Sequence, residues 1–155
     1  MRTAVVSLCL IALAGCGEAP KPAPAPEKRA TAPKPLDESH RLPRQGQVET
    51  KLVEKELMGK SFLPGGNVGT YKQGGKTYEV FMARLSSAED SPLALLQWKK
   101  EMTGARLIPS FGGYFGDDAG QPVFVFTKGA WIAGVKGLPE KDADPVAREL
   151  ASRLN

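Results

Sequence analysis

Cysteine and histidine are scarce in this 155-residue sequence, and from residue 47 onward it has neither. The two cysteines are Cys9 and Cys16, and the one histidine, His40, lies in a proline-rich segment. Disulfides, cysteine nucleophiles and thiolate metal sites are therefore excluded from residues 47–155. Histidine acid–base chemistry is excluded there as well, because a catalytic histidine needs rigid surroundings. We expect no metal and no cofactor.

The sequence also has no hydrophobic run long enough to span a membrane. Residues 4–14 are apolar apart from Ser7, and they follow the single positive charge of Arg2. A transmembrane helix needs roughly 20 apolar residues, so this shorter run is typical of the central part of a signal peptide. The run ends in Leu13-Ala14-Gly15-Cys16, which resembles the lipobox of bacterial lipoproteins.

This resemblance implies that residues 1–15 are a lipoprotein signal peptide and that Cys16 becomes the first residue of the mature protein. In that family the cysteine thiol carries diacylglycerol and the new amino terminus is usually acylated, which gives the two or more chains needed for stable anchoring. Gly17 follows the cysteine where an aspartate would favour the inner membrane. The resemblance therefore implies an outer-membrane protein facing the periplasm. A plain secretory signal, cut a few residues later, is the alternative.

Residues 16–45 are predicted to be a lipidated cysteine followed by a disordered tether. The segment is rich in Pro, Ala, Lys and Glu and has almost no large apolar side chains. Such a composition buries too little surface to offset the entropy lost on ordering, so an extended, partly polyproline-II chain is expected. The tether would hold the following domain away from the bilayer, which favours a protein partner in the envelope.

The net charge of +4 comes mostly from the N-terminal part of the chain. From Gly46 onward, 14 Lys and Arg stand against 13 Asp and Glu. A domain this close to neutral lacks the basic surface that nucleic-acid binding needs. We therefore expect no nucleic-acid partner.

Residues 46–155 are predicted to form one α+β domain, in which an antiparallel sheet of about five strands packs with two to three helices. Glycine-containing turns at 73–75 and 128–129 join apolar runs into two hairpins. Ser91-Pro92 predicts a helix start, with the serine as cap. The expected elements are a short helix over 48–57, strands at 68–72 and 76–85, a helix over 91–102, strands at 106–108, 123–127 and 131–136, and a helix from Pro145.

Apolar side chains occupy both faces of two of these strands. In residues 78–85 and 123–126 they do not alternate with polar ones, as they would in a sheet with one face in water. Both faces should therefore be covered. The helices and loops of the same chain are the first explanation. A sheet face that meets a protein partner or a small apolar ligand is the second.

The segment between residues 111 and 120 contains the candidate functional residues. Phe111, Tyr114 and Phe115 are aromatic residues beside glycines, which makes this segment the best candidate for a binding loop, although core packing is the simpler explanation. Asp117 and Asp118 form an adjacent acidic pair that we interpret as a surface turn. They lack the further oxygen ligands of a calcium site.

The order of elements over residues 62–137 is similar to that of a bacterial family known only as domain of unknown function number 6599. The similarity lies in Tyr78 to Met82, a helix, a glycine–aromatic stretch, and the runs 123–129 and 131–135. It includes no diagnostic motif and implies no activity.

Three hypotheses for the function follow. The first is a non-enzymatic envelope module that docks a protein partner through the aromatic loop or a sheet face. The second is a small-molecule-binding domain, which requires an apolar cavity between the sheet and the helices. The third is an enzyme that uses Asp117 or Asp118 as an acid or base, which requires a carboxylate with a raised pKa in a cleft.

Overall fold

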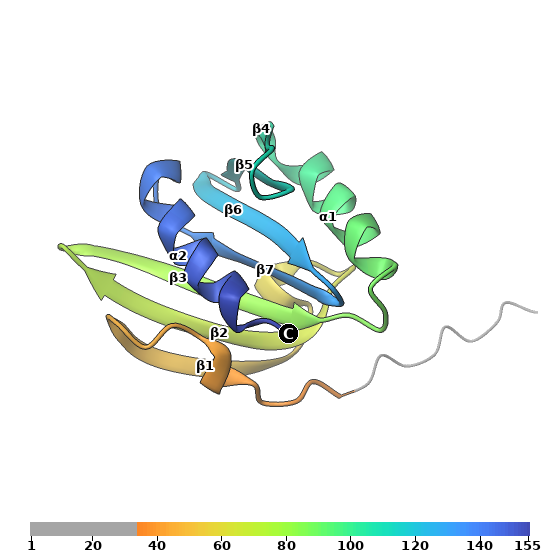
Figure 1. The fold of residues 1–155 in the computed structure, drawn as a ribbon, viewed down its shortest axis with the longest axis horizontal. Helices are drawn as coiled ribbons and strands as arrows, with labels where there is room; N and C mark the ends of the chain where they lie inside the picture. Colours follow the sequence, from red (N-terminus) through yellow and green to blue (C-terminus); the bar gives the residue numbers. More distant parts are fainter. Residues whose placement is uncertain (1–33) are drawn as a thin grey trace, which may run out of the picture. The chain divides into compact units, whose positions relative to one another are not determined.

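A seven-stranded antiparallel sheet forms the centre of the computed structural model, which describes residues 34–155 (Figure 1). The predicted signal peptide, Cys16 and the tether as far as residue 33 lie outside the described residues. The elements are η1 (Ser39–Arg41), β1 (Gln47–Lys55), η2 (Leu57–Gly59), β2 (Pro64–Gln73), β3 (Lys76–Arg84), α1 (Asp90–Glu101), β4 (Thr103–Ile108), β5 (Gly113–Asp118), β6 (Gln121–Lys128), β7 (Trp131–Lys136) and α2 (Glu140–Arg153).

The strand order is β1-β2-β3-β7-β6-β5-β4, so two meanders meet where β3 pairs with β7. All six neighbouring pairs are antiparallel. The predicted α+β class with an antiparallel sheet is confirmed. The predicted number of about five strands is too low, because β1 was expected to be a helix and β5 a loop.

Both predicted hairpins are present. Gly74 and Gly75 have φ of 56° and 76°, and they join Gln73 of β2 to Lys76 of β3. Gly129, with φ of 55°, begins the two-residue turn between β6 and β7. Glycine adopts these positive φ angles without steric strain, which is why the turns could be predicted correctly from the glycines in the sequence.

The helix expected over residues 48–57 is wrong: the segment is the edge strand β1. Val48 and Leu52 are exposed, Val53 is half-buried, and Leu57 is buried in the separate turn η2. Glu56 and Met58 have φ of 55° and 56°, which interrupts any regular helix here. An edge strand that is mostly exposed needs few apolar residues. The near-helical spacing of the apolar residues in this segment was therefore not evidence for a helix.

One helix covers each face of the sheet. The α2 face is lined mainly by aromatic and aliphatic side chains of β3, β6 and β7, which pack with Ala143, Ala147, Leu150 and Leu154. On the opposite face, Phe81, Val123 and Ile132 of the sheet pack against the α1 side. Their partners are Leu95 and Trp98 of α1 and Met102 directly after it, the three residues predicted to form the apolar face of this helix. The apolar runs on both faces are thus explained by burial within residues 34–155.

The starts of the two helices differ from the prediction. Ser91 does not cap α1; it is buried and its hydroxyl donates to the carbonyl oxygen of Gly129 at 2.7 Å. The N-cap position is Glu89, which makes no side-chain capping hydrogen bond, and the Asp90 N–H donates to Ser87 Oγ at 3.3 Å. Helix α2 begins at Glu140, after Pro139, so Pro145 lies inside the helix rather than at its start.

The last residues of the predicted tether belong to the domain. Leu42 is 1% exposed in the core of the α2 face. The Glu38 N–H donates to Asn67 Oδ1 at 3.0 Å, and Asn67 Nδ2 donates to Asp37 Oδ1 at 2.8 Å. This arm, residues 34–42, is therefore fixed to the sheet, although its composition resembles that of a free linker. Between residues 34 and 155, no helix is both long and apolar enough to cross a membrane.

Candidate functional site

The three aromatic residues predicted as a binding loop do not form a loop. Phe111 lies in the turn after β4, and Tyr114 and Phe115 lie on β5. Phe111 packs edge-to-face on Phe126 and Phe124, with ring centroids 4.6 and 5.3 Å apart. Tyr114 packs with the α1-side core and Phe115 with the α2-side core. The loop was therefore predicted wrongly, and the three rings do not share one binding surface.

Asp117 and Asp118 also have structural surroundings. Asp117 accepts a hydrogen bond from the Gly120 N–H at 2.7 Å and so stabilises the turn between β5 and β6. Asp118 is 6% exposed, which contradicts its interpretation as part of a surface turn. Its two carboxylate oxygens accept from Lys60 Nζ at 2.8 Å and from Trp98 Nε1 at 2.9 Å. Because each oxygen already accepts a hydrogen bond and the side chain is buried, Asp118 is not open to a substrate.

Lys60 is the centre of a polar group that we call the Lys60 network, which consists of the buried residues Lys60, Trp98 and Asp118 and the half-exposed Glu101. Lys60 Nζ lies 2.8 Å from both Glu101 Oε2 and Asp118 Oδ1, and it lies 5.5 Å from the centroid of the Trp98 ring. Burial alone lowers the pKa of Lys60, but the hydrogen bonds and charges of the two carboxylates outweigh burial and raise it. The network joins the segment after η2 to α1 and β5.

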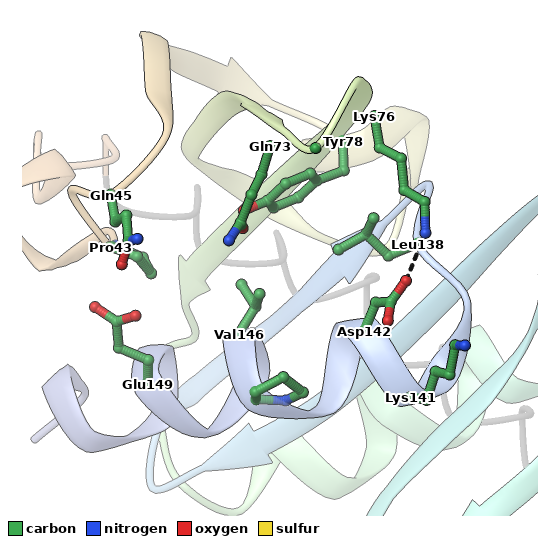
Figure 2. Close-up of a pocket in the computed structure, with 12 residues that line it drawn as sticks. Pro43, Gln45, Gln73, Lys76, Tyr78, Leu138, Lys141, Asp142, Val146 and Glu149 are labelled. Atoms are coloured by element: carbon green, nitrogen blue, oxygen red, sulfur yellow. Dashed lines mark hydrogen bonds and ion pairs between the residues drawn. The ribbon is translucent and has the colours of Figure 1, made fainter.

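A cleft lies at the end of the β2–β3 hairpin, between that hairpin and α2 (Figure 2). Its volume is about 470 Å³, and it is open to solvent. Figure 2 shows the hairpin residues above, α2 below, and Pro43 and Gln45 closing one end. The lining residues are Pro43, Gln45, Gln73, Gly74, Lys76, Tyr78, Leu138, Lys141, Asp142, Pro145, Val146 and Glu149.

Tyr78 gives the cleft a rigid wall. Its ring stacks on Tyr71, with centroids 5.2 Å apart and an angle of 16° between the planes. The Tyr71 hydroxyl in turn donates to the carbonyl oxygen of Pro43 at 2.7 Å, which fixes the end of the cleft. Burial raises the pKa of Tyr78, and the nearby Glu149 carboxylate raises it further. Tyr78 therefore stays neutral and is available for apolar contact and hydrogen bonding.

Charges of both signs lie around this cleft. Lys76 Nζ is 2.6 Å from Asp142 Oδ2 at one end, and this pair is partly exposed. Hydrogen bonding to Lys76 lowers the pKa of Asp142. Glu149, near the other end, pairs with Arg153 at 2.8 Å. Lys141 adds a further cation to the wall.

Amide and apolar side chains complete the lining. Gln73 Oε1 accepts from the Tyr78 hydroxyl at 3.4 Å, and Gln45 lies across from it beside Pro43. Leu138 is 4% exposed and Val146 is half-buried, so both offer apolar surface at the bottom of the cleft. The lining includes no serine, threonine, cysteine or histidine. The arrangement suits binding of a ligand that is partly polar and partly apolar.

Sequence reasoning missed this cleft entirely. Its walls come from residues 43–45, 73–78 and 138–149, which are far apart in the chain. The turn glycines at 74 and 75 and Pro145 were noticed, but as signals of local structure. Only the tertiary fold, which places α2 beside the start of β3, brings these segments together.

No family model matches the chain, and neither the search of curated proteins nor that of solved structures found a match. The similarity to bacterial lipoproteins and to the domain of unknown function number 6599 stays a prediction. Within residues 34–155, no group of three or more His, Cys, Asp or Glu side chains is arranged to hold a metal ion.

Proposed function

We propose that this chain is a membrane-anchored lipoprotein of the bacterial envelope, attached through Cys16, whose domain is a non-enzymatic interaction module. In this proposal the domain binds an extended segment of an envelope protein in the cleft between the β2–β3 hairpin and α2. The observation that carries the proposal is the cleft itself, with its fixed tyrosine wall, its amide side chains and its paired charges.

The anchor part of the proposal rests on the sequence. A short apolar run, the Leu13-Ala14-Gly15-Cys16 pattern and a proline-rich continuation occur in the order that a lipoprotein requires. We place the protein at the outer membrane, facing the periplasm, because Gly17 follows the cysteine. Cys9 falls within the predicted signal peptide and is expected to be removed with it.

A peptide segment fits the lining better than a purely apolar ligand does. The side-chain amides of Gln45 and Gln73 offer both donors and acceptors to a peptide backbone. Leu138 and Val146 offer apolar contact to alternate side chains of an extended chain. Lys76 and Asp142 neutralise each other, so a ligand of either charge avoids strong repulsion.

A non-enzymatic role is supported by the chemistry of the described residues. Asp118 is held by Lys60 and Trp98, and Asp117 stabilises a turn, so neither lines a cleft with a free carboxylate. The candidate binding cleft has no nucleophile beside a base of the kind that acyl or phosphoryl transfer uses.

The anchor is tested by labelling cells with a clickable palmitate analogue. The full chain should be labelled and found in the membrane fraction, and Cys16→Ala should lose both properties. Cys9→Ala is the matched control, because it removes the other cysteine and should keep the label. Equal labelling of the Cys16→Ala chain would disprove anchoring at Cys16.

The cleft is tested with a photoreactive amino acid at Val146 in cells. We expect a cross-linked band that contains a second, defined envelope protein. The control is the same amino acid at Leu107, which is exposed on β4 and is not among the residues that line the cleft. Gln73→Ala combined with Gln45→Ala should weaken the Val146 band. No band at Val146 above the Leu107 control would contradict protein binding in the cleft.

A small-molecule-binding domain is the second candidate, because the cleft volume of about 470 Å³ lies in the range of ligand pockets. The two candidates differ in one result. A small molecule that co-purifies with the chain, and is lost in Val146→Arg, together with no cross-linked protein, would favour the second candidate over the first.

A further inference from the structure

The outer edge of β1 has no partner strand within residues 34–155. The strand is nine residues long, and its side chains are exposed from Val48 to Leu52. Val48 is 59% exposed and Leu52 is 40% exposed. An edge of this length presents free N–H and C=O groups on which another strand can pair.

The opposite edge of the sheet, β4, is less available. It has six residues, and its pairing with β5 is irregular between Thr103 and Arg106. Arg106 forms an ion pair with Glu140 of α2 and lies over the ring of Phe115, 5.6 Å from its centroid. A short, irregular and charged strand is how natural sheets prevent further pairing. The irregularity of β1 is confined to residues 47–49, so residues 49–55 form a regular edge.

The charges along the regular part of β1 are complementary to themselves. The sequence from 49 to 55 reads Glu-Thr-Lys-Leu-Val-Glu-Lys. When two copies pair antiparallel about Leu52, each Glu49 faces Lys55 of the other copy, and the two Leu52 side chains face each other. Opposite charges and apolar side chains in such facing positions stabilise antiparallel pairs.

Neighbouring registers are less favourable. Centring the pair on Lys51 places the two Lys51 side chains opposite each other. Centring it on Val53 places Lys51 opposite Lys55 twice. Centring it on Thr50 draws Val48, which lies at the irregular position of β1, into the ladder. Like charges that face each other destabilise a strand pair, so the charges exclude the Lys51 and Val53 registers. The Thr50 register would place Glu49 opposite Lys51, and it is disfavoured by the irregular pairing at residues 47–49 instead.

We infer that the β1 edge is the interface of a symmetric dimer, in which β1 pairs antiparallel with β1 of a second copy of this chain, centred on Leu52. The two sheets then continue as one sheet of fourteen strands. The twofold axis of such a pair is perpendicular to the sheet, so each face of the joined sheet carries the same elements from both copies.

This geometry is compatible with two membrane anchors. The arm at residues 34–42 joins the core of the α2 face through Leu42. Because the axis is perpendicular to the sheet, both arms lie on the same face of the dimer. Both chains can then lead to one membrane, and confinement there raises the effective concentration of the copies. The inference does not depend on the cleft proposed above as a peptide site.

The first test introduces Leu52→Cys into the full-length chain in cells. Oxidation should give a disulfide-linked dimer on non-reducing electrophoresis, because the two residues face each other across the axis. The unsubstituted chain controls for Cys9 and Cys16, and Leu107→Cys controls for an exposed cysteine on the other edge. A disulfide dimer no stronger than in Leu107→Cys, or a cross-link only to a different protein, would overturn the inference.

The second test changes the charges in the Leu52→Cys background. Glu49→Lys places lysine opposite Lys55 twice and should lower the dimer signal about tenfold, and Lys55→Glu should do the same. The double variant Glu49→Lys/Lys55→Glu restores opposite charges and should restore the signal. Co-expression of the two single variants should give the mixed dimer, since each opposes the other's charge. The side chains of Glu49, Leu52 and Lys55 are all exposed, so the fold should persist in every variant. Equal dimer signals in the single and double variants would overturn the proposed register.

Discussion

The domain contains two lysine–aspartate pairs that are chemically alike but lie in opposite surroundings. In Lys60–Asp118 the nitrogen and oxygen are 2.8 Å apart, and the side chains are 9% and 8% exposed. In Lys76–Asp142 they are 2.6 Å apart, and the side chains are 52% and 35% exposed. The first pair lies among Trp98 and Glu101, and the second lies in the wall of the cleft.

The difference shows how burial decides what an ion pair does. A buried pair has lost its hydration, so removal of one partner leaves a charge that water cannot reach. When an exposed pair separates, water hydrates both charges, so the net change in free energy is small, and salt screens the attraction further. We therefore assign Lys60–Asp118 to the stability of the fold, and we expect Lys76–Asp142 to be free to rearrange when a ligand binds.

The largest expected effect comes from breaking the buried pair. Asp118→Ala leaves Lys60 with only the half-exposed Glu101 and removes the acceptor of Trp98 Nε1. We expect the free energy of unfolding to fall by about 3 to 5 kcal/mol, measured by urea denaturation of the purified chain.

Asp117→Ala is the matched control for that variant, since it removes the neighbouring carboxylate of the same strand. It loses the hydrogen bond from the Gly120 N–H and should cost only about 1 kcal/mol. Similar losses in the two variants would mean that the Lys60 network does not stabilise the fold as its burial implies.

A smaller effect is expected from the tyrosines behind the cleft at high pH. Burial raises the pKa of Tyr71 to about 12, with the neighbouring Tyr78 adding to the shift. Above pH 10 the unfolded chain releases the tyrosine proton while the folded chain retains it, so stability falls as the pH rises from 10 towards 12. The loss should reach about 2 kcal/mol, measured by denaturation at a series of pH values.

Tyr71→Phe sharpens this test, because it removes the titrating hydroxyl and keeps the ring. At neutral pH it should cost about 1 kcal/mol through the lost hydrogen bond to Pro43. Its stability should then decline less steeply than that of the unsubstituted chain above pH 10. An unchanged slope would show that another group controls the alkaline loss.

The smallest effect on stability is expected at the exposed pair. Lys76→Gln or Asp142→Asn should change the free energy of unfolding less than any of the variants above, and salt should reduce the difference further. The same variants should alter the cross-link formed from Val146, because both side chains line the cleft. A large stability loss without any change in cross-linking would place this pair with the Lys60 network instead.

Local signals in the sequence predicted the parts of the fold that local physics controls. The β2–β3 and β6–β7 turns followed from glycines at positions with positive φ, and the buried face of α1 followed from the spacing of Leu95, Trp98 and Met102. Strand β1 was missed because an exposed edge has no regular apolar pattern. Strand β5 was missed because Gly113 and Gly116 suggested a loop. In fact a side chain at Gly113 would clash with the Val125 carbonyl, 2.5 Å away.

Glycine at 116 illustrates the same limit. A side chain there would lie 3.0 Å from the backbone of Thr103 and Ala105 on β4, so close strand packing explains it. That reason depends on a neighbouring strand, which a reading along the chain does not supply. Asp118 is similar: its neighbours in sequence suggest a turn, but its partners Lys60 and Trp98 come from distant segments.

Four properties could be read from the sequence: residues 47–155 contain no cysteine or histidine, the domain is nearly neutral, glycine turns join antiparallel strands, and both faces of the central strands are covered. These properties depend on composition and on short-range backbone preferences. Three others became known from the folded chain alone: which carboxylate is buried, where the cleft lies and which strand edge is open. Each of these depends on contacts between segments far apart in the chain, and such contacts are fixed by the order of strands in the sheet.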